Sequence, residues 1–393
     1  MRKGWEYKKL GEVCCPKSKI QRATKCFGGS DEILYIDISS IDNSVQEVNS
    51  ITSFTMSNAP SRAQQKVEYG DIIVSTVRPN LKNVAVIKQH DSNLVASSGF
   101  CVLRTTDDIE RNYLFRYITS DIFTQHLMKL TTGANYPAVR DLDVRDSTIP
   151  LPPKSTQIAI VSELDKINEL IRLKKEQLKD FDNLAQSLFY EMFGDPVENE
   201  KGWEVKKLGE ICTDITDGDH MPPPKSESGI PFITISDIDK DTRCLNFENT
   251  FYVPEDYYNN LKENRKPQKG DLLYTVTGSY GIPVIVKTDK RFCFQRHIAL
   301  LRPNKEILST IFLCYWVLSD GVKFMADKVA TGIAQKTVGL NSIRKFSCIL
   351  PPLSLQRLFA QRIEQIEREK SEVQKSIQDL ETLLASRMQY WFE

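Results

Sequence analysis

Apolar residues recur at alternating steps of four and three in the middle of the chain and again at its end. In the first stretch the positions are 160, 164, 167, 171, 174, 178, 181, 185 and 188, and all but Lys174 are apolar. The second stretch lies 199 residues further on, and all but Lys370 and Arg387 are apolar. A 3.5-residue period held this long is typical of a coiled coil. The alternative is an ordinary amphipathic helix on a globular core, and the charged residues between the seam positions favour the coiled coil.

Each seam comes after a Leu-Pro-Pro triplet, at 151–153 and at 350–352. Two prolines interrupt the preceding structure and fix φ at the point where the next element begins. Ser155 and Ser354 come next, where a hydroxyl group can cap the first helical turn. A helix of about 38 residues is about 57 Å long, more than packing on a globular region requires. We therefore expect the two helices to pair antiparallel, with a globular region at each end.

Shorter apolar runs precede each helix. Residues 33–38, 71–77, 84–87 and 100–103 alternate or are β-branched, and such runs predict strands separated by turns. A helical stretch interrupts them at about 112–130, with a counterpart at about 308–328 in the second half. The mixture predicts a compact α+β domain in each half.

The whole pattern occurs twice. The phrase "WEYKKLGEVC" at 5–14 returns as "WEVKKLGEIC" at 203–212, and "IPLPPKSTQ" at 149–157 returns as "CILPPLSLQ" at 348–356. The copies lie 198 and 199 residues apart, which indicates duplication of one unit of about 195 residues. A solenoid would need a shorter period and more copies.

Composition places the chain among ordinary globular proteins. Its 393 residues, 40% hydrophobic and 26% charged, predict two to three domains. No apolar run reaches the length of a membrane span and the N-terminus has no apolar signal core, so we expect a cytoplasmic protein with no membrane partner. The nine cysteines form no CxxC pair and none lies at metal-ligand spacing from the four histidines, which favours buried reduced thiols.

The net charge of zero conceals an uneven distribution. Residues 262–305 hold ten Lys and Arg against three acidic residues, a local excess of seven positive charges. Such an excess can meet a phosphate backbone. A solvated surface face is the alternative, and charge alone favours it.

The chain lacks the usual signatures of an independent enzyme. No GxGxxG comes after a predicted strand, and no GxxxxGK[ST] phosphate cradle occurs. The stretch "DITDGDHMPPP" at 214–224 can offer oxygen ligands to a cation, yet an acidic turn before a stiff loop is the favoured interpretation. We assign no catalytic residue and no metal ligand.

Two regions, each opened by "W…KLGE" and closed by "LPP…Q" and a long helix, resemble the DNA-specificity subunit of type I restriction–modification enzymes, from Gly4 to Phe392. The resemblance implies target-recognition domain 1 at 1–150, a first conserved spacer helix at 151–196, target-recognition domain 2 at 197–349 and a second spacer helix at 350–393. Each domain would read one half of a bipartite, asymmetric double-stranded DNA site, and the coiled coil would set the spacing between the halves.

The resemblance also implies partners. The helices would dock two methyltransferase (M) subunits, and two restriction/translocase (R) subunits would then join. S-adenosylmethionine, ATP and Mg would belong to these partner subunits, and this chain would carry no cofactor and perform no chemistry.

We expect base contacts from loops of the two recognition domains, because polar side chains on loops can reach base edges. The loops are 76–83 and 131–140 in domain 1, and 275–281, 294–299 and 330–338 in domain 2. The candidates are Arg78, Asn80, Lys82, Asn135, Tyr136, Arg140, Thr277, Ser279, Tyr280, Gln295, Arg296, His297, Gln335, Lys336 and Thr337. For any single one, an ordinary turn or surface role is the equal alternative.

Other repeated residues have structural interpretations. The Gly-Asp pairs at 70–71 and 270–271 are interpreted as turns that open a strand. Trp5 and Trp203 are interpreted as core anchors, in preference to base-stacking residues. The aromatic residues at the helix ends either cover those ends or belong to the methyltransferase interface; they are Tyr190, Phe193, Trp391 and Phe392.

Two other classes of function remain open. One is a coiled-coil protein–protein scaffold that does not bind nucleic acid. The other is an enzyme whose active site the motifs do not reveal. Steep salt dependence of DNA binding would separate a DNA-reading subunit from a scaffold.

Overall fold

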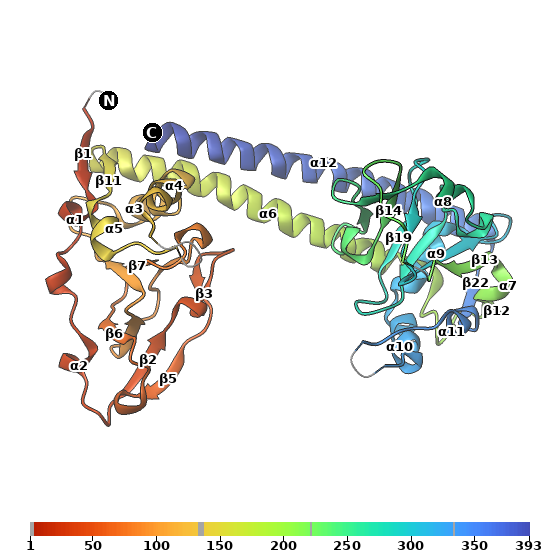
Figure 1. Ribbon diagram of the computed structural model, residues 1–393, viewed down its shortest axis with the longest axis horizontal. Coiled ribbons are helices and arrows are strands. Elements are labelled where there is room, and N and C mark those ends of the chain that lie inside the picture. Colours follow the sequence, from red (N-terminus) through yellow and green to blue (C-terminus); the bar gives the residue numbers. More distant parts are fainter. Residues whose placement is uncertain (1–3, 133–136, 221, 333–334) are drawn as a thin grey trace. The chain divides into compact units, whose positions relative to one another are not determined.

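The computed structural model describes residues 4–132, 137–220, 222–332 and 335–393. The chain divides into two compact units (Figure 1). Unit 1 contains Met1–Lys174 and Ser376–Glu393, and unit 2 contains Lys175–Lys375. Each long helix therefore begins in one unit and ends in the other. The domain boundaries drawn from the sequence stay predictions.

Unit 1 contains the strands and helices of the first repeat. They are β1 (Glu6–Lys9), α1 (Leu10–Val13), α2 (Ala23–Cys26), β2 (Glu32–Ile36), β3 (Ile41–Asp42), β4 (Glu47–Val48), β5 (Thr52–Thr55), β6 (Ala63–Lys66), β7 (Ile72–Ser75), β8 (Val84–Val86), β9 (Leu94–Ser97), β10 (Phe100–Leu103), α3 (Arg111–Ile118), α4 (Asp121–Leu130), α5 (Asp141–Asp146), β11 (Thr148–Leu151) and the start of α6 (Lys154–Phe193).

Unit 2 repeats this order with small changes. Its elements are β12 (Glu204–Lys207), α7 (Leu208–Ile211), β13 (Cys212–Asp217), β14 (Ile230–Ile233), β15 (Ile238–Asp239), β16 (Cys244–Leu245), β17 (Phe251–Val253), α8 (Glu255–Asn259), β18 (Leu272–Thr275), β19 (Pro283–Ile285), β20 (Cys293–Phe294), β21 (Ile298–Pro303), α9 (Thr310–Leu318), α10 (Asp320–Val329), α11 (Leu340–Arg344), β22 (Ser347–Leu350) and the start of α12 (Leu353–Phe392).

The two units share their sheet topology. The sheet β10-β7-β8 of unit 1 corresponds to β21-β18-β19 of unit 2, where β13 adds a fourth strand. A second sheet contains a parallel pair in each unit, β2 with β9 and β14 with β20. The opening strand of each repeat pairs antiparallel with its last strand, β1 with β11 and β12 with β22. Two similar α+β units joined by two long helices confirm the predicted fold class and the internal repeat.

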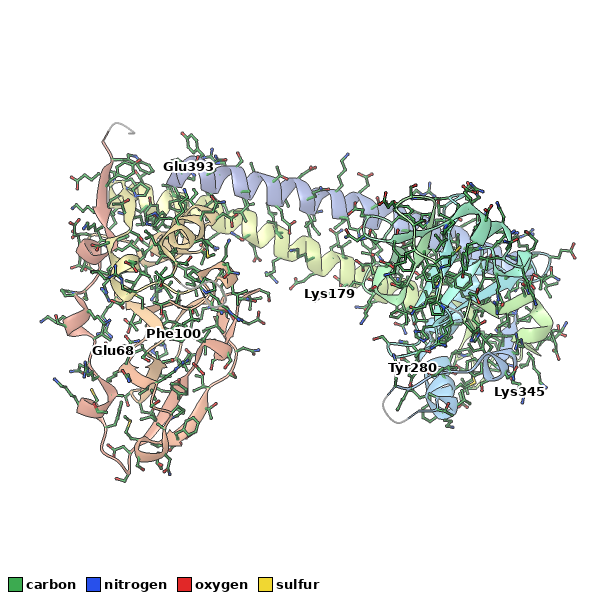
Figure 2. All side chains as sticks on the ribbon, in the orientation of Figure 1. Glu68, Phe100, Lys179, Tyr280, Lys345 and Glu393 are labelled. Carbon is green, nitrogen blue, oxygen red and sulfur yellow. The ribbon has the colours of Figure 1, made fainter. Side chains whose placement is uncertain are left out.

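The central strand β7 is buried on both faces. Ile72 and Val74 face a core that contains residues of α3, α4 and α6, whereas Ile73 faces a core shared with β2 and β9. Because both faces are covered, the sequence of the strand is a continuous apolar run and does not alternate between apolar and polar residues. Phe100 of β10, labelled in Figure 2, is 2% exposed and faces the same side as Ile73.

The predicted helical stretch at 112–130 is two helices, α3 and α4, and its counterpart is also two, α9 and α10. Ser120 ends the first helix of unit 1, because its hydroxyl accepts the Phe123 amide and caps α4. In unit 2 the extended backbone of Ser319 (φ −64°, ψ 149°) separates the helices. Buried apolar residues occur on both sides of each break, so the sequence pattern did not reveal that the stretch is divided into two helices.

The seam positions of α6 and α12 are all buried or half-buried, as the heptad pattern predicts. In unit 2, Asp182 of α6 contacts Lys370 of α12 and Phe189 packs on Phe359. From Asp182 to Phe189 the residue numbers of α6 increase, whereas those of their partners on α12 decrease from Lys370 to Phe359. The two helices therefore pair antiparallel. In unit 1 the end of α12 packs on the start of α6 in a single core cluster. The coiled coil is confirmed.

A buried glutamine attaches the start of each helix to its own domain. Gln157 donates to the carbonyls of Pro152 (2.9 Å) and Asp108 (3.2 Å) and accepts the Glu110 amide (2.8 Å). Gln356 makes the same three kinds of bond in unit 2. These bonds satisfy backbone groups where the chain turns into the helix. They account for the glutamine in the repeated Leu-Pro-Pro motif.

The predicted serine caps are wrong. The helices begin at Lys154 and Leu353, directly after the second proline. Ser155 and Ser354 therefore lie inside the first turn. The fixed φ of proline suits it to the start of a helix, and each helix begins two residues earlier than a serine cap would place it.

The end of each helix is buried in an aromatic core. Phe392 of α12 is 4% exposed in unit 1, with its ring 5.3 Å from that of Tyr113. Phe193 of α6 is fully buried in unit 2, 4.8 Å from the ring of Phe312. These side chains cover the helix ends. Each unit is thus completed by the helix that began in the other half of the sequence.

The repeated tryptophan of the opening phrase packs beside the same helix ends. Trp5 stacks on Trp391 with ring centroids 6.1 Å apart in unit 1. In unit 2 the indole of Trp203 donates to the carbonyl of Phe193 (2.9 Å). Both tryptophans pack against the core of their unit, which confirms their interpretation as anchors.

The repeated aspartates at 71 and 271 do more than open a strand. The Asp71 carboxylate is 1% exposed and receives two bonds from the Arg104 guanidinium, of 2.7 and 2.8 Å. Asp271 and Arg302 repeat this arrangement at 3.0 and 2.9 Å. Two parallel bonds to a buried carboxylate are strong and directional. Each pair therefore ties the start of one strand to the end of its neighbour.

We expect Phe193→Ala to lower the free energy of unfolding by about 3–5 kcal/mol, because a fully buried phenyl ring is replaced by a cavity. Leu184→Ala is the matched control on the same helix, since Leu184 is 52% exposed and its loss should cost within about 0.5 kcal/mol. Denaturant unfolding of both variants measures the difference. Equal destabilisation would contradict the packing described for Phe193.

Candidate nucleic-acid interface

Three loops of unit 2 meet beyond the end of β18. They are the loop after β18, the turn between β20 and β21, and the loop between α10 and α11. The amide of Val276 donates to the His297 carbonyl (2.9 Å), and the amide of Val338 donates to the Val276 carbonyl (2.9 Å). The amide of Gly278 donates to the Lys336 carbonyl (3.0 Å). Backbone bonds thus assemble three predicted loops into one cluster, which we call loop cluster 2.

The loop between α10 and α11 is closed at its base. Thr331 and Thr337 exchange two backbone hydrogen bonds of 2.9 and 2.8 Å. Thr337 also pairs with Thr277, and their hydroxyl oxygens lie 3.3 Å apart. Gly332 has φ +114°, and a Cβ there would lie 2.2 Å from a backbone oxygen. The glycine is therefore required for the closed loop to form.

Unit 1 contains an equivalent arrangement, called loop cluster 1. The amide of Thr76 donates to the Gly99 carbonyl (2.9 Å), and the amide of Val139 donates to the Thr76 carbonyl (2.9 Å). The amide of Arg78 donates to the Pro137 carbonyl (2.7 Å). The same strand end holds the same two neighbours in both units, although the loop sequences differ.

Three predicted residues of loop cluster 2 present exposed polar side chains. Arg296, Gln335 and Lys336 are all exposed. A Cβ on Gly278 would lie 3.0 Å from the Gln335 amide nitrogen, so the glutamine side chain lies close over the backbone of the neighbouring loop. A guanidinium, an amide and an ammonium group together can contact both base edges and phosphates.

Other predicted residues of this cluster have structural roles. Thr277 is 7% exposed and holds the closed loop. The Ser279 hydroxyl accepts a bond from the Lys240 ammonium (3.2 Å). The Tyr280 hydroxyl donates to Asp327 of α10 (2.5 Å), and Figure 2 labels this tyrosine at the edge of unit 2. These contacts hold the loop after β18 in place.

Gln295 and His297 are half-buried on either side of Arg296. The amide of Gln295 donates to the Ile233 carbonyl (2.9 Å), which ties the turn to the parallel sheet. Burial, together with the neighbouring Arg296 guanidinium, lowers the pKa of His297. The imidazole is therefore neutral at pH 7, and Arg296 carries the positive charge of this turn.

In loop cluster 1, Arg78 and Asn80 are exposed. Arg78 has a left-handed backbone (φ 49°), an uncommon conformation for a residue with a side chain. Asn135 and Tyr136 lie outside the described residues. DNA contact by any of these residues stays a prediction.

The other two predicted residues of unit 1 are engaged in ion pairs. The Lys82 ammonium lies 2.7 Å from Asp121 of α4. The Arg140 guanidinium lies 2.7 Å from Asp143 and is 78% exposed. An exposed pair of this kind is weak, so a phosphate can compete for either cation.

The sequence did not single out the hairpin tip that touches each cluster. In unit 2, Lys240 comes after β15 and reaches Ser279. In unit 1, Asn43 comes after β3, and its amide donates to the Leu81 carbonyl (3.0 Å). Both residues come directly after a further pair of similar segments, "YIDISSID" at 35–42 and "FITISDID" at 232–239, and this similarity was the signal that could have identified them.

Five of the ten Lys and Arg residues in the basic segment at 262–305 pair with acidic neighbours. Arg265 lies 3.4 Å from Asp217, and Arg302 is bound to Asp271. Further pairs join Lys266 to Glu263, Lys269 to Asp289 and Arg291 to Glu255. The excess of charge in the sequence therefore does not form one uncompensated patch.

The acidic stretch at 214–224 is held by cations and hydroxyls of unit 2. Arg265 approaches both Asp217 (3.4 Å) and Asp219 (3.7 Å). The Tyr257 hydroxyl donates to Asp219 (3.1 Å). Among the described residues, no group of three or more His, Cys, Asp and Glu side chains is arranged to hold a metal ion. The prediction of an acidic turn is wrong for residues 214–217, which lie in β13.

All nine cysteines are free thiols. Six are buried, and burial raises the pKa of Cys14, Cys212 and Cys314 to about 12. Cys244 is exposed, unlike the buried thiols expected from the sequence. In the part of the chain that the structure describes, no helix combines the length and the apolar character that a membrane crossing requires.

Comparisons with known proteins agree with the duplicated architecture. The "Type I restriction enzyme MjaIX specificity subunit" of Methanocaldococcus jannaschii is 26% identical over 186 residues, 43% of this chain and 42% of that subunit. The "Putative type I restriction enzyme MjaX specificity subunit" of the same organism is 21% identical over 349 residues, 82% of this chain and 79% of that one.

A solved chain from work on "complex assembly and conformational transition of the type I R-M system" is similar along its length, with 28% identity and a TM-score of 0.71. The similarity covers 100% of this chain and 98% of that one. The family model described as "Type I restriction modification DNA specificity domain" matches residues 2–180 and again 200–382. The chain therefore belongs to the type I restriction–modification DNA specificity family, and it carries the family's domain twice.

Proposed function

We propose that this chain is the non-catalytic, sequence-specific DNA-recognition subunit of a type I restriction–modification complex. Each loop cluster reads one half of a bipartite double-stranded DNA site. One observation carries the proposal: the same three-segment loop cluster occurs in both units on the same backbone bonds, with different exposed side chains. A fixed scaffold with variable polar side chains is what base recognition requires.

Loop cluster 2 has the chemistry for direct readout of bases. An arginine can donate two bonds to guanine, and a glutamine can bind adenine through a donor and an acceptor. Arg296 and Gln335 supply these groups on adjoining loops, and Lys336 supplies a charge for phosphate. The neutral His297 beside Arg296 can donate or accept one further bond.

Loop cluster 1 offers a different set. Arg78 and Asn80 lie on the loop after β7, whereas the corresponding loop of unit 2 carries Thr277 and Ser279. Different donors and acceptors select different bases. The two half-sites therefore differ, and the whole target is asymmetric.

The long helices set the spacing of the half-sites and dock the enzymatic partners in this proposal. Leu170, Leu173 and Leu184 of α6 lie outside the seam and are 47%, 46% and 52% exposed. Exposed apolar residues on a charged helix favour coverage by a protein partner. We assign two methyltransferase subunits to this surface, with two restriction/translocase subunits joining them. S-adenosylmethionine, ATP and Mg belong to those partners.

Mapping methylated bases in DNA exposed to the complex assembled with methyltransferase subunits tests the proposal. We expect modification at one split, asymmetric sequence with a fixed number of unread base pairs. Assembly without any DNA modification would overturn the assignment. Assembly together with no DNA binding at low salt would support a protein–protein scaffold instead.

We expect Arg296→Gln and Lys336→Gln each to weaken DNA binding. If the side chain contacts a phosphate, each change should lower the slope of log K against log salt by about one. Lys206→Gln is the control, because Lys206 lies on β12, pairs with Glu204 and belongs to none of the three loops of loop cluster 2. Fluorescence anisotropy at several salt concentrations measures the affinity for DNA and its salt slope in the loop variants and in the control. Unchanged affinity in both loop variants would remove these residues from the interface.

Inserting one heptad into α6 and one at the facing position of α12 tests the spacing role. Seven residues add about 10 Å to a helix. We expect a longer unread spacer, or loss of recognition if the added length and the DNA twist do not match. Modification of a site with the original spacer would refute the proposal that the helices set the distance.

A further inference from the structure

A buried lysine interrupts the apolar seam in unit 2. Lys370 is 9% exposed, and its ammonium lies 2.8 Å from the Asp182 carboxylate of α6 and 3.5 Å from Glu367 of its own helix. The corresponding seam position in the first repeat is Ile171, which is also buried. The lysine therefore replaces an apolar residue that this position accommodates.

A second cation reaches the same carboxylate from the recognition domain. The Arg243 guanidinium, on the hairpin β15–β16, lies 3.1 Å from Asp182. Arg243 has a left-handed backbone (φ 53°), as Gln46 does at the corresponding place in unit 1 (φ 58°). Asp182 thus joins α6, α12 and the hairpin. We call Lys370, Asp182 and Arg243 the Asp182 cluster.

A charged residue in a coiled-coil seam lowers stability and selects one register. If α12 moved along α6 by one turn, about 5.4 Å, the ammonium would lose the 2.8 Å contact with Asp182 and keep only the longer one with Glu367 of its own helix. The Asp182 cluster therefore penalises every register but one. An isoleucine, as in the first repeat, would impose no such penalty.

The same hairpin also contacts loop cluster 2. Lys240 at its tip donates to Ser279, and Arg243 three residues later binds Asp182. The hairpin therefore links the helix pair to the loops through two polar contacts within one unit. A change in the helix register would be transmitted to the loops by this route.

We propose that the Asp182 cluster is a determinant of spacer selectivity, because it fixes the helix register in unit 2 and, through the hairpin, the position of loop cluster 2. Lys370 and Arg243 are positioning residues that need not touch DNA. This inference rests on the proposed function.

The test uses the complete complex and a DNA library in which only the number of unread base pairs varies. Lys370→Met keeps the side-chain length and makes the seam apolar. Arg243→Gln uses the residue that unit 1 has at this left-handed position. Lys375→Met is the matched control, because Lys375 is an exposed lysine on the same helix. Methylation at each spacer length and the thermal midpoint are measured for every variant.

We expect both variants to reduce the preference for the best spacer over its neighbours by about two- to thirtyfold, the range of coupling that such networks carry. The thermal midpoint of Lys370→Met should change little, because the Asp182 carboxylate is 46% exposed and keeps Arg243 as a partner. A lower midpoint with an unchanged spacer preference would show a purely stabilising lysine and overturn the inference.

Hydrogen exchange of the hairpin gives a readout that does not depend on DNA. We expect amides of residues 238–245 to exchange faster in Lys370→Met and Arg243→Gln than in Lys375→Met. If the wild-type complex modifies no library member, the proposed function fails, while this measurement still tests the cluster. Unchanged exchange in both variants would overturn the link between helices and hairpin.

Discussion

The burial of each helix end in the core of the other repeat's unit is the constraint on which the structure depends. α6 starts in unit 1, held by Gln157, and ends in unit 2 with Phe193 fully buried. α12 starts in unit 2 at Gln356 and ends in unit 1 with Phe392 buried. Both helices are therefore fixed at both ends. The core of each unit therefore contains residues from both halves of the sequence.

In both loop clusters, backbone hydrogen bonds hold the loops together, and exposed side chains supply the groups that can contact DNA. Backbone amides and carbonyls join the strand end to its two neighbours in both units, and such bonds do not depend on side-chain identity. The exposed side chains are then free to differ, as Arg296 and Gln335 do from Arg78 and Asn80. Loops positioned by a rigid scaffold commonly carry function for this reason. In loop cluster 1, Lys82 and Arg140 are paired with Asp121 and Asp143, which leaves Arg78 and Asn80 as exposed candidates for base contact.

The sequence predicted the features that local periodicity determines. The heptad pattern located every seam residue, because a 3.5-residue period has one geometric solution, and the long repeat indicated two similar α+β units. Sequence periodicity could not predict contacts between residues that are far apart in the chain. Nothing local to Asp71 indicates that Arg104 will bind it, and nothing local to Lys240 indicates a contact with Ser279. The serine caps failed for a different reason: each helix begins directly after the second proline, so the serine lies inside the first turn. The sequence indicated the aspartate–arginine pairs only through the repeated Gly-Asp at 70–71 and 270–271.

The glutamine at each helix start has a consequence for how such a protein can change. Its bonds go to main-chain atoms alone: in unit 1 they involve Asp108 and Glu110, and in unit 2 the equivalents are Ile307 and Ser309. An acidic pair in one repeat and an aliphatic–hydroxyl pair in the other make identical bonds. The glutamine contact therefore does not depend on the side chains of the residues that it binds, so a different domain with the same backbone path could form it again.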